Sequence, residues 1–283
     1  MRLDYRPRRA CVLVALLAFG CKDDTPPPAE DTTGTSTGMA DDTTGTTGVD
    51  SVDTTAGDQG GSSSEGGSST GLPTEVAMQG VIQDFVAMQP IVGAEIAVLG
   101  QPGLMTTSDA RGMWQLSGLA VDTFDRFIVA ESTDYWGAVI PFTTGFEDIE
   151  DVELSQVSLA GIDIQIGVLQ GQDPTVMVEP DTAVLLVAVE QNTATGAVVE
   201  LEPPPADNAF YAPDAGGQPQ LGSNVAEWGF RPLVVFFNLQ PGPEGDYRVT
   251  VTHPERECTP EDPEPPTFGQ HISLIRVDCP PVN

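Results

Sequence analysis

Lysine and histidine are almost absent from this sequence of 283 residues, which contains one lysine, Lys22, and two histidines. The chain carries 42 acidic against 11 basic residues, a formal net charge of −31 at pH 7. From residue 76 onward, thirty Asp and Glu stand against six Arg, a net charge of −24. So acidic a surface repels phosphate backbones and anionic lipid headgroups. We therefore expect no nucleic-acid partner.

Motifs that position catalytic groups are also missing from residues 76–283. This segment contains no G-x-S-x-G elbow, no H-E-x-x-H pair, no phosphate-binding loop and no dinucleotide-binding glycine pattern. With only His253 and His271 as imidazole bases, a Ser-His-Asp triad would have no supporting motif. We expect no enzymatic activity and no cofactor, and we keep a hydrolase of unknown type as the less favoured alternative.

Long apolar runs are lacking except near the N-terminus. Four arginines in the first nine residues precede an uninterrupted apolar run over residues 10–20, which ends at Cys21. A charged segment followed by a short apolar segment and small residues is typical of a secretory signal. As a helix the run would be about 16 Å long, too short for the roughly 30 Å of bilayer hydrocarbon. The pattern predicts a signal peptide over residues 1–20.

The segment Leu17–Cys21 resembles the lipobox of bacterial lipoproteins. Gly20 and Cys21 match that pattern, whereas Ala18 stands where leucine is usual and Phe19 is bulkier than typical. The resemblance implies that Cys21 is acylated and becomes the first residue of the mature protein. Several acyl chains on one residue attach a protein stably to a membrane. The implied location is the bacterial cell envelope, at the outer membrane or cell surface. The alternative is an ordinary signal peptide that leaves Cys21 as a free thiol.

Residues 21–75 then combine this cysteine with a segment made of Thr, Gly, Ser, Asp and Pro in near-repeats. Eight Asp and three Glu stand against Lys22 in this segment. So little apolar surface does not offset a backbone entropy cost of roughly 1–2 kcal/mol per residue, so we expect a disordered tether. Its r.m.s. span would be about 40 Å, enough to hold a folded body away from a membrane.

The remaining residues alternate apolar and polar side chains with period two, and Gly, Pro, Asn and Asp interrupt the alternation. Short strands with turn signals between them predict an all-β fold of tandem antiparallel β-sandwiches, Ig-like or prealbumin-like. We place one sandwich at residues 76–157 and a second at 181–283. The predicted strands are Met78–Phe85, Ala94–Leu99, Leu104–Ser108, Met113–Leu116, Arg126–Glu131, Ala138–Phe142, Val152–Leu154, Ala183–Glu190, Ala197–Glu202, Phe210–Ala212, Leu233–Leu239, Tyr247–Thr252 and Ile272–Val277.

Between the two sandwiches, residues 158–180 form a predicted linker. The stretch Ser155–Gln170 fits neither a helical nor a strand period cleanly. A short helix is our first interpretation of it, and a strand is the alternative.

Three blocks in the first sandwich resemble the carboxypeptidase regulatory-like, prealbumin-type domain. They are Gly80–Asp84, Pro90–Val98 and Thr106–Leu116, in the order and at the spacing of that family. The resemblance covers Val76 to about Val157 and implies a seven-stranded sandwich of the kind appended to enzymes or carried on envelope proteins. The second set of strands looks like a looser relative of the first, which suggests a duplication.

Local turn chemistry agrees with this interpretation. Asp109 and Gly112 suit a tight turn, which would present Trp114 and Leu116 to the core of the sandwich.

Three cysteines remain after the predicted cleavage. Besides Cys21, the pair Cys258 and Cys279 in an exported protein predicts a disulfide. The alternatives for this pair are a thiol nucleophile and a metal site.

Both histidines lie near this predicted loop, together with Glu255 and Glu257. A zinc site of His and Glu is conceivable, but the spacing of known zinc motifs is missing. We therefore interpret His253 and His271 as surface histidines without a metal.

Two further regions are candidates for binding. Tyr135 and Trp136, beside Gly137, would form an exposed aromatic loop that could stack on a sugar, although a core role is the more common alternative. The long segment Ala206–Trp228 is the second candidate, because loops on a rigid scaffold often carry recognition. An acidic cluster could supply Ca²⁺ ligands, although we expect a solvated edge; its members are Glu147, Asp148, Glu150, Asp151 and Glu153.

Together these features predict a non-enzymatic envelope lipoprotein whose sandwiches bind or scaffold a protein or polysaccharide. The alternative is an accessory docking subunit of an exported assembly.

Overall fold

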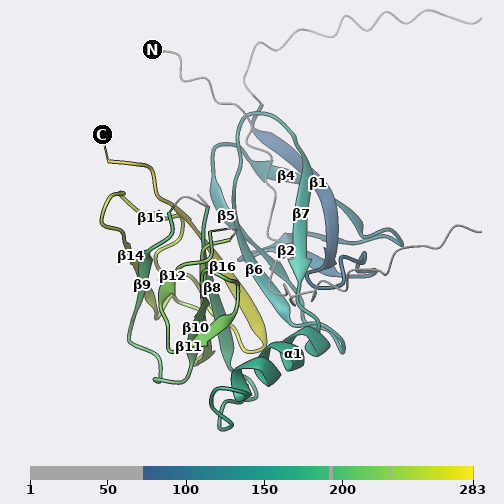
Figure 1. The fold of residues 1–283 in the computed structure, drawn as a ribbon. Helices are drawn as coiled ribbons and strands as arrows, with labels where there is room; N and C mark the ends of the chain where they lie inside the picture. Colours follow the sequence, from purple (N-terminus) through teal and green to yellow (C-terminus); the bar gives the residue numbers. More distant parts are fainter. Residues whose placement is uncertain (1–72, 191–193, 230, 283) are drawn as a thin grey trace, which may run out of the picture. The chain divides into compact units, whose positions relative to one another are not determined.

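In the part of the chain that the structure describes, two three-stranded sheets and one long mixed sheet build the fold (Figure 1). The computed structural model describes residues 73–190, 194–229 and 231–282. All of these residues belong to one compact unit.

In the first half, a three-stranded sheet packs against one part of the long sheet. The small sheet has the order β4 (Met113–Ala120), β1 (Glu75–Asp84), β7 (Ile149–Gln156). The part of the long sheet has the order β6 (Gly137–Thr143), β5 (Phe124–Val129), β2 (Glu95–Val98), β3 (Gln101–Thr107).

Three aromatic rings from these strands lie at the centre of the first core. Trp114 meets Phe127 edge-on with ring centroids 5.3 Å apart, and Phe127 stacks on Phe142 at 4.0 Å. All three rings are at most 5% exposed. Alternation along β1 places every second side chain in this core, as expected for a strand with one buried face.

The second half repeats the arrangement with a smaller covering sheet. That sheet has the order β12 (Val225–Ala226), β9 (Ala197–Glu202), β14 (Arg248–Thr252). It covers a part of the long sheet ordered β11 (Pro219–Leu221), β10 (Phe210–Pro213), β13 (Leu233–Leu239), β8 (Ala183–Val189), β16 (His271–Asp278), and β15 (Thr259–Pro260) also pairs with β16. Side chains of β9 and β14 share one core cluster with those of β8, β13 and β16.

Strands β8 and β13 are buried on both faces. Their second face belongs to the same core cluster as Leu169 of α1 (Leu159–Gln170) and Val176. Ser158 caps the start of this helix, and its hydroxyl accepts a hydrogen bond from the Gly161 amide at 3.3 Å. In the described part of the chain, no helix combines the length and apolarity that a membrane span requires.

The two halves share the long sheet because β6 and β16 pair in parallel, from His271 opposite Gly137 to Ser273 opposite Val139. Arg126 on β5 reinforces the junction through two hydrogen bonds to the carboxylate of Asp262, of 2.6 and 2.8 Å. The predicted linker at residues 158–180 therefore does not interrupt the sheet.

The all-β class is confirmed. Each of the thirteen predicted strands corresponds to a strand of the structure, and residues 159–170 adopt the helix that was our first interpretation. The unpredicted strands β11, β12 and β15 have two or three residues each, too few to show a period. We expected antiparallel sandwiches, but β1–β7, β6–β16 and β8–β16 pair in parallel.

The predicted turn after β3 is also confirmed. One carboxylate oxygen of Asp109 accepts hydrogen bonds from the amides of Arg111 and Met113 at 2.8 and 2.9 Å. These bonds lower the pKa of Asp109. Gly112 has φ of +73°, a conformation that favours glycine. Trp114 and Leu116 are buried beyond the turn, as expected.

Candidate functional site

The predicted lipidation site lies outside the described residues. Cys21 and most of the predicted tether precede residue 73, where the description begins. Acylation of Cys21 therefore stays a prediction.

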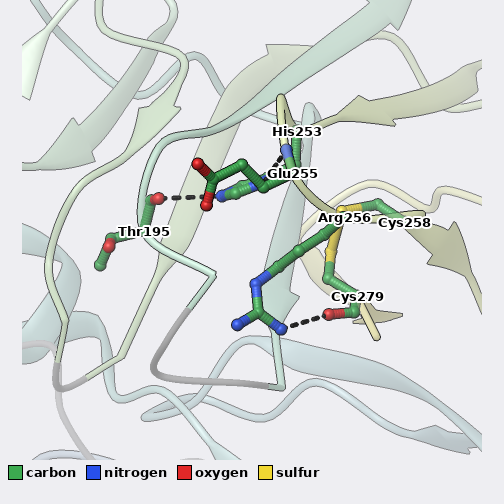
Figure 2. The surroundings of a disulfide bond; sticks show 6 residues. All are labelled: Thr195, His253, Glu255, Arg256, Cys258 and Cys279. Atoms are coloured by element: carbon green, nitrogen blue, oxygen red, sulfur yellow. Dashed lines mark hydrogen bonds between the residues drawn. A yellow bond between two sulfur atoms is a disulfide. The ribbon is translucent and has the colours of Figure 1, made fainter. Parts of the chain in front are cut away.

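The predicted disulfide between Cys258 and Cys279 is confirmed (Figure 2). It joins the segment before β15 to the residue after β16, and Arg256 donates a hydrogen bond to the Cys279 carbonyl oxygen at 2.9 Å. Cys279 is fully buried. The thiolate is the nucleophilic and metal-binding form of cysteine, and a disulfide has none, so those alternatives do not apply to this pair.

His253 uses both ring nitrogens to hold the loop beside this disulfide (Figure 2). Its Nδ1 accepts a hydrogen bond from the Glu255 amide at 3.0 Å, and its Nε2 lies 3.1 Å from the Thr195 carbonyl oxygen. Because a carbonyl oxygen is only an acceptor, the proton of this ring lies on Nε2. The ring therefore has a structural role.

The interpretation of His271 as a surface residue is wrong. His271 is 6% exposed, because its ring packs on Gly137 of β6. A Cβ added to Gly137 would lie 2.3 Å from this ring. The ring Nδ1 lies 2.8 Å from the Gly269 carbonyl oxygen, and Nε2 lies 3.4 Å from a Glu131 carboxylate oxygen. His253 lies beside the disulfide of Cys279, which follows the end of β16. His271 begins β16 and is therefore roughly 25 Å from Cys279 along the strand. The two histidines therefore do not converge on one zinc site.

The prediction of an exposed aromatic pair is wrong for Trp136, which is 6% exposed. Two backbone hydrogen bonds fix its loop at the start of α1: the Trp136 amide donates to the Val157 carbonyl oxygen at 3.1 Å, and the Leu159 amide donates to the Asp134 carbonyl oxygen at 2.9 Å. Tyr135 is half-buried. Burial, followed by the negative charge of Asp84, raises the pKa of the Tyr135 phenol, which hydrogen-bonds to that carboxylate.

The acidic cluster of residues 147–153 forms the exposed side of β7 and the turn before it. Asp148 accepts a hydrogen bond from the Ala77 amide at 2.8 Å. Among the residues that the structure describes, no three His, Cys, Asp or Glu side chains gather in a way that could hold a metal ion.

A groove with a volume of about 470 Å³ opens along β9. We call it the β9 groove. Glu200, Leu201 and Glu202 of β9 line it, together with Pro204, Pro205 and Asp207 from the chain that follows this strand. Phe210 and Phe236, with ring centroids 6.0 Å apart, provide apolar surface inside it. Ligand sites typically have volumes of about 300–1,000 Å³, so the groove is large enough for a short peptide or small molecule.

The backbone of Leu201 faces this groove. On β14, Val249 lies opposite Leu201 in the register. The Val249 amide donates to the Pro263 carbonyl oxygen at 2.8 Å, so it forms no backbone hydrogen bond with Leu201. Two residues earlier on β9, Val199 forms two hydrogen bonds with Asn224, on the side of β9 that faces away from β14. The Val199 amide donates to the Asn224 carbonyl oxygen, and the Val199 carbonyl oxygen accepts from the Asn224 side-chain amide, each at 2.9 Å. Backbone groups two residues apart in a strand point the same way, so those of Leu201 also point away from β14.

The chain that follows β9 does not close this edge. Residues 203–205 are three prolines, which have no amide hydrogen to donate. Strand β12 pairs with β9 as far as Val198. The hydrogen bonds of Asn224 continue this pairing by one residue, to Val199. On the groove side, none of the described residues pairs with the backbone of Leu201.

The groove is negatively charged. Three exposed carboxylates line it, those of Glu200, Glu202 and Asp207. Arg248 is its one lining cation among the described residues, and its guanidinium lies 3.9 Å from Glu264. This excess of carboxylates favours a ligand with positive charge.

Sequence reasoning located this groove only in part. The predicted binding segment Ala206–Trp228 supplies Asp207, Phe210 and Asn224 to it, but the wall on β9 was not predicted. The proline triplet after Glu202 was the available signal, because it prevents a hairpin from closing the edge of β9.

Comparisons with known proteins identify no family. No family model matches the chain, and no curated protein matches it. The resemblance to carboxypeptidase regulatory-like domains therefore stays a prediction.

Several solved structures are similar at low identity. The Bacillus anthracis TIE protein is 13% identical over 73% of this chain with a TM-score of 0.24, and the match covers 34% of that protein. The shaft pilin SpaA from Lactobacillus rhamnosus GG is 8% identical over 74% of this chain and 99% of its own, with a TM-score of 0.21. A variant of BcpA, the major pilin subunit of Bacillus cereus, is 10% identical over 72% of this chain and 99% of its own, with a TM-score of 0.22. Similarity at this level carries no functional argument.

Proposed function

We propose that this protein is a non-catalytic envelope lipoprotein whose all-β body binds a partner away from the membrane. The observation that carries the proposal is the sequence around Cys21, where a short apolar run ends at a cysteine and a long acidic spacer follows. The acidic body supports it, because a net charge of −24 keeps the domain away from anionic lipid while the anchor retains it nearby.

Metabolic labelling tests the anchor. In a bacterial host that processes lipoproteins, we expect the wild type to incorporate labelled palmitate and to fractionate with membranes. Cys21→Ser should incorporate none and should be released in soluble form, because the acyl chains are its membrane attachment. A serine variant that stays in the membrane fraction would contradict the proposal. Cys11→Ser serves as the matched control, since Cys11 lies within the predicted signal peptide.

The non-catalytic part of the proposal needs a separate test. Purified protein should not hydrolyse ester and peptide libraries faster than a His253→Ala variant does. Any turnover that the wild type shows and this variant loses would return the hydrolase alternative.

A further inference from the structure

We propose that the β9 groove binds an extended, positively charged peptide segment of a partner protein by adding it as a strand beside β9. This inference rests on the proposed function in assigning the body a partner, and it names the chemistry of that partner. Strand addition at a free sheet edge is a common mode of peptide recognition, with backbone hydrogen bonds supplying affinity and alternate side chains supplying specificity.

The backbone of β9 supports the pairing. Val199 is already bonded on the groove side by Asn224, whereas Leu201 presents its amide and carbonyl there. A peptide entering beyond Asn224 would continue the line of β12 along β9 and would pair with Leu201. The exposed backbone groups of one central residue thus define where the peptide lies.

Alternation along β9 then determines which side chains the peptide needs. Glu200 and Glu202 are exposed on the outer face, and Leu201 is buried toward Phe236 in the same core cluster. Successive residues of an added strand point alternately to these two faces. Residues beside the glutamates would carry Lys or Arg, and residues on the inner side would be apolar to contact Phe210.

The same charges exclude the occupants that this chain could itself supply. A second copy pairing through β9 would bring Glu200 and Glu202 against their equivalents, and like charges on adjacent strands destabilise a sheet. The spacer over residues 22–72 is acidic and would be repelled as well. A basic strand from another protein remains the occupant that complements the groove.

A peptide with alternating lysine and valine, seven residues long with both termini blocked, is the probe for this proposal. It is titrated into the full-length chain in nonionic detergent, with ¹⁵N-labelled leucine followed by NMR. The Leu201 amide signal should shift and should become protected from hydrogen exchange. The same peptide with N-methylated valines should bind at least about tenfold more weakly, because methylation removes backbone donors.

Two matched double variants separate the groove from the general acidity of the protein. Glu200→Gln with Glu202→Gln should weaken binding by about tenfold, whereas Glu147→Gln with Glu150→Gln, an equal change on the exposed edge at β7, should leave it unchanged. No binding, equal effects of both doubles, equal affinity of the N-methylated peptide, or shifts confined to other leucines would each overturn the proposal. The peptide titration does not depend on acylation of Cys21. Failure of the groove proposal is therefore distinguishable from failure of the palmitate test.

Discussion

Gly80 controls how closely β1 can approach its parallel partner β7. A Cβ built on Gly80 would lie 1.8 Å from the carbonyl oxygen of Val152. Because the obstacle is main chain, no side-chain rotation relieves the overlap, and one of the two strands must move. Glycine at this position is therefore required by the close approach of two strands rather than by a turn.

We predict that Gly80→Ala destabilises the protein by about 3 kcal/mol, because it forces apart two strands on which the first core packs. Urea unfolding followed by circular dichroism measures the change. Gly103→Ala is the matched control, since Gly103 also lies in a strand, β3, and no atom beyond its two chain neighbours lies within 4 Å of the position of its Cβ. The control should stay within about 0.5 kcal/mol of the wild type, and equal losses in both variants would contradict this explanation.

At the scale of elements, β16 holds the second half together. It pairs with β8 along most of its length, with β6 over its first three residues, and with β15 near its end. The disulfide closes the loop that contains β15 onto the residue after β16, across a sequence separation of 21. It therefore restrains the unfolded chain in the segment that completes the long sheet.

Removing this disulfide should lower the free energy of unfolding by about 3 kcal/mol, as loop-closure entropy predicts for a ring of this size. For a domain of this length the thermal midpoint should fall by roughly 6–12 °C. Calorimetry of the wild type with and without reductant measures the loss. Cys258→Ser with Cys279→Ser should already have the lower midpoint and should not respond to reductant. Peptide mapping that found two free thiols in the exported protein would refute the prediction.

At the scale of the whole molecule, charged groups meet where the two halves join. The buried Asp262 carboxylate accepts two hydrogen bonds from the Arg126 guanidinium. These hydrogen bonds raise the pKa of Arg126. Arg276 donates to the Pro141 carbonyl oxygen at 2.9 Å and lies 3.9 Å from Glu261. Burial raises the pKa of Glu261, although the nearby Arg276 acts in the opposite direction. The junction therefore disfavours the charged form of one carboxyl group.

The sign of the resulting pH dependence follows from this raised pKa. The folded state binds the Glu261 proton more tightly than the unfolded state, whose pKa is near 4.5. The stabilisation that protonated Glu261 contributes is thus fully present below pH 4.5, and it is lost as the pH rises through the pKa of Glu261 in the folded state. Glu261→Gln should stabilise the protein at pH 7, by less than about 1 kcal/mol since the side chain is 25% exposed, and the gain should disappear below pH 4.5.

Urea unfolding at both pH values checks this prediction. Glu257→Gln, at an exposed position near the disulfide, should change stability little at either pH. A Glu261→Gln variant that is less stable than the wild type at pH 7 would show that the attraction to Arg276 outweighs burial.

Local chemistry alone was sufficient to predict most strands of this protein. The alternation of apolar side chains located the strands from β1 to β16 other than three very short ones, because period two is a property of the strand itself. The turn at Asp109 and Gly112 was predictable for the same reason, since its bonds lie within five residues. The disulfide followed from the number of cysteines expected after cleavage.

The tertiary structure decided which faces are buried and which edges stay open. Trp136 and His271 lie in segments that look like surface loops or strand ends, and both are buried, His271 against Gly137 of the strand paired with β16. The β9 groove likewise depends on the register of Leu201 against Val249, which no local pattern encodes. The sequence by itself determined the strands, the turn and the cysteine pair. Pairing between distant segments decided the shared sheet and the site, because burial and strand register arise only when those segments meet.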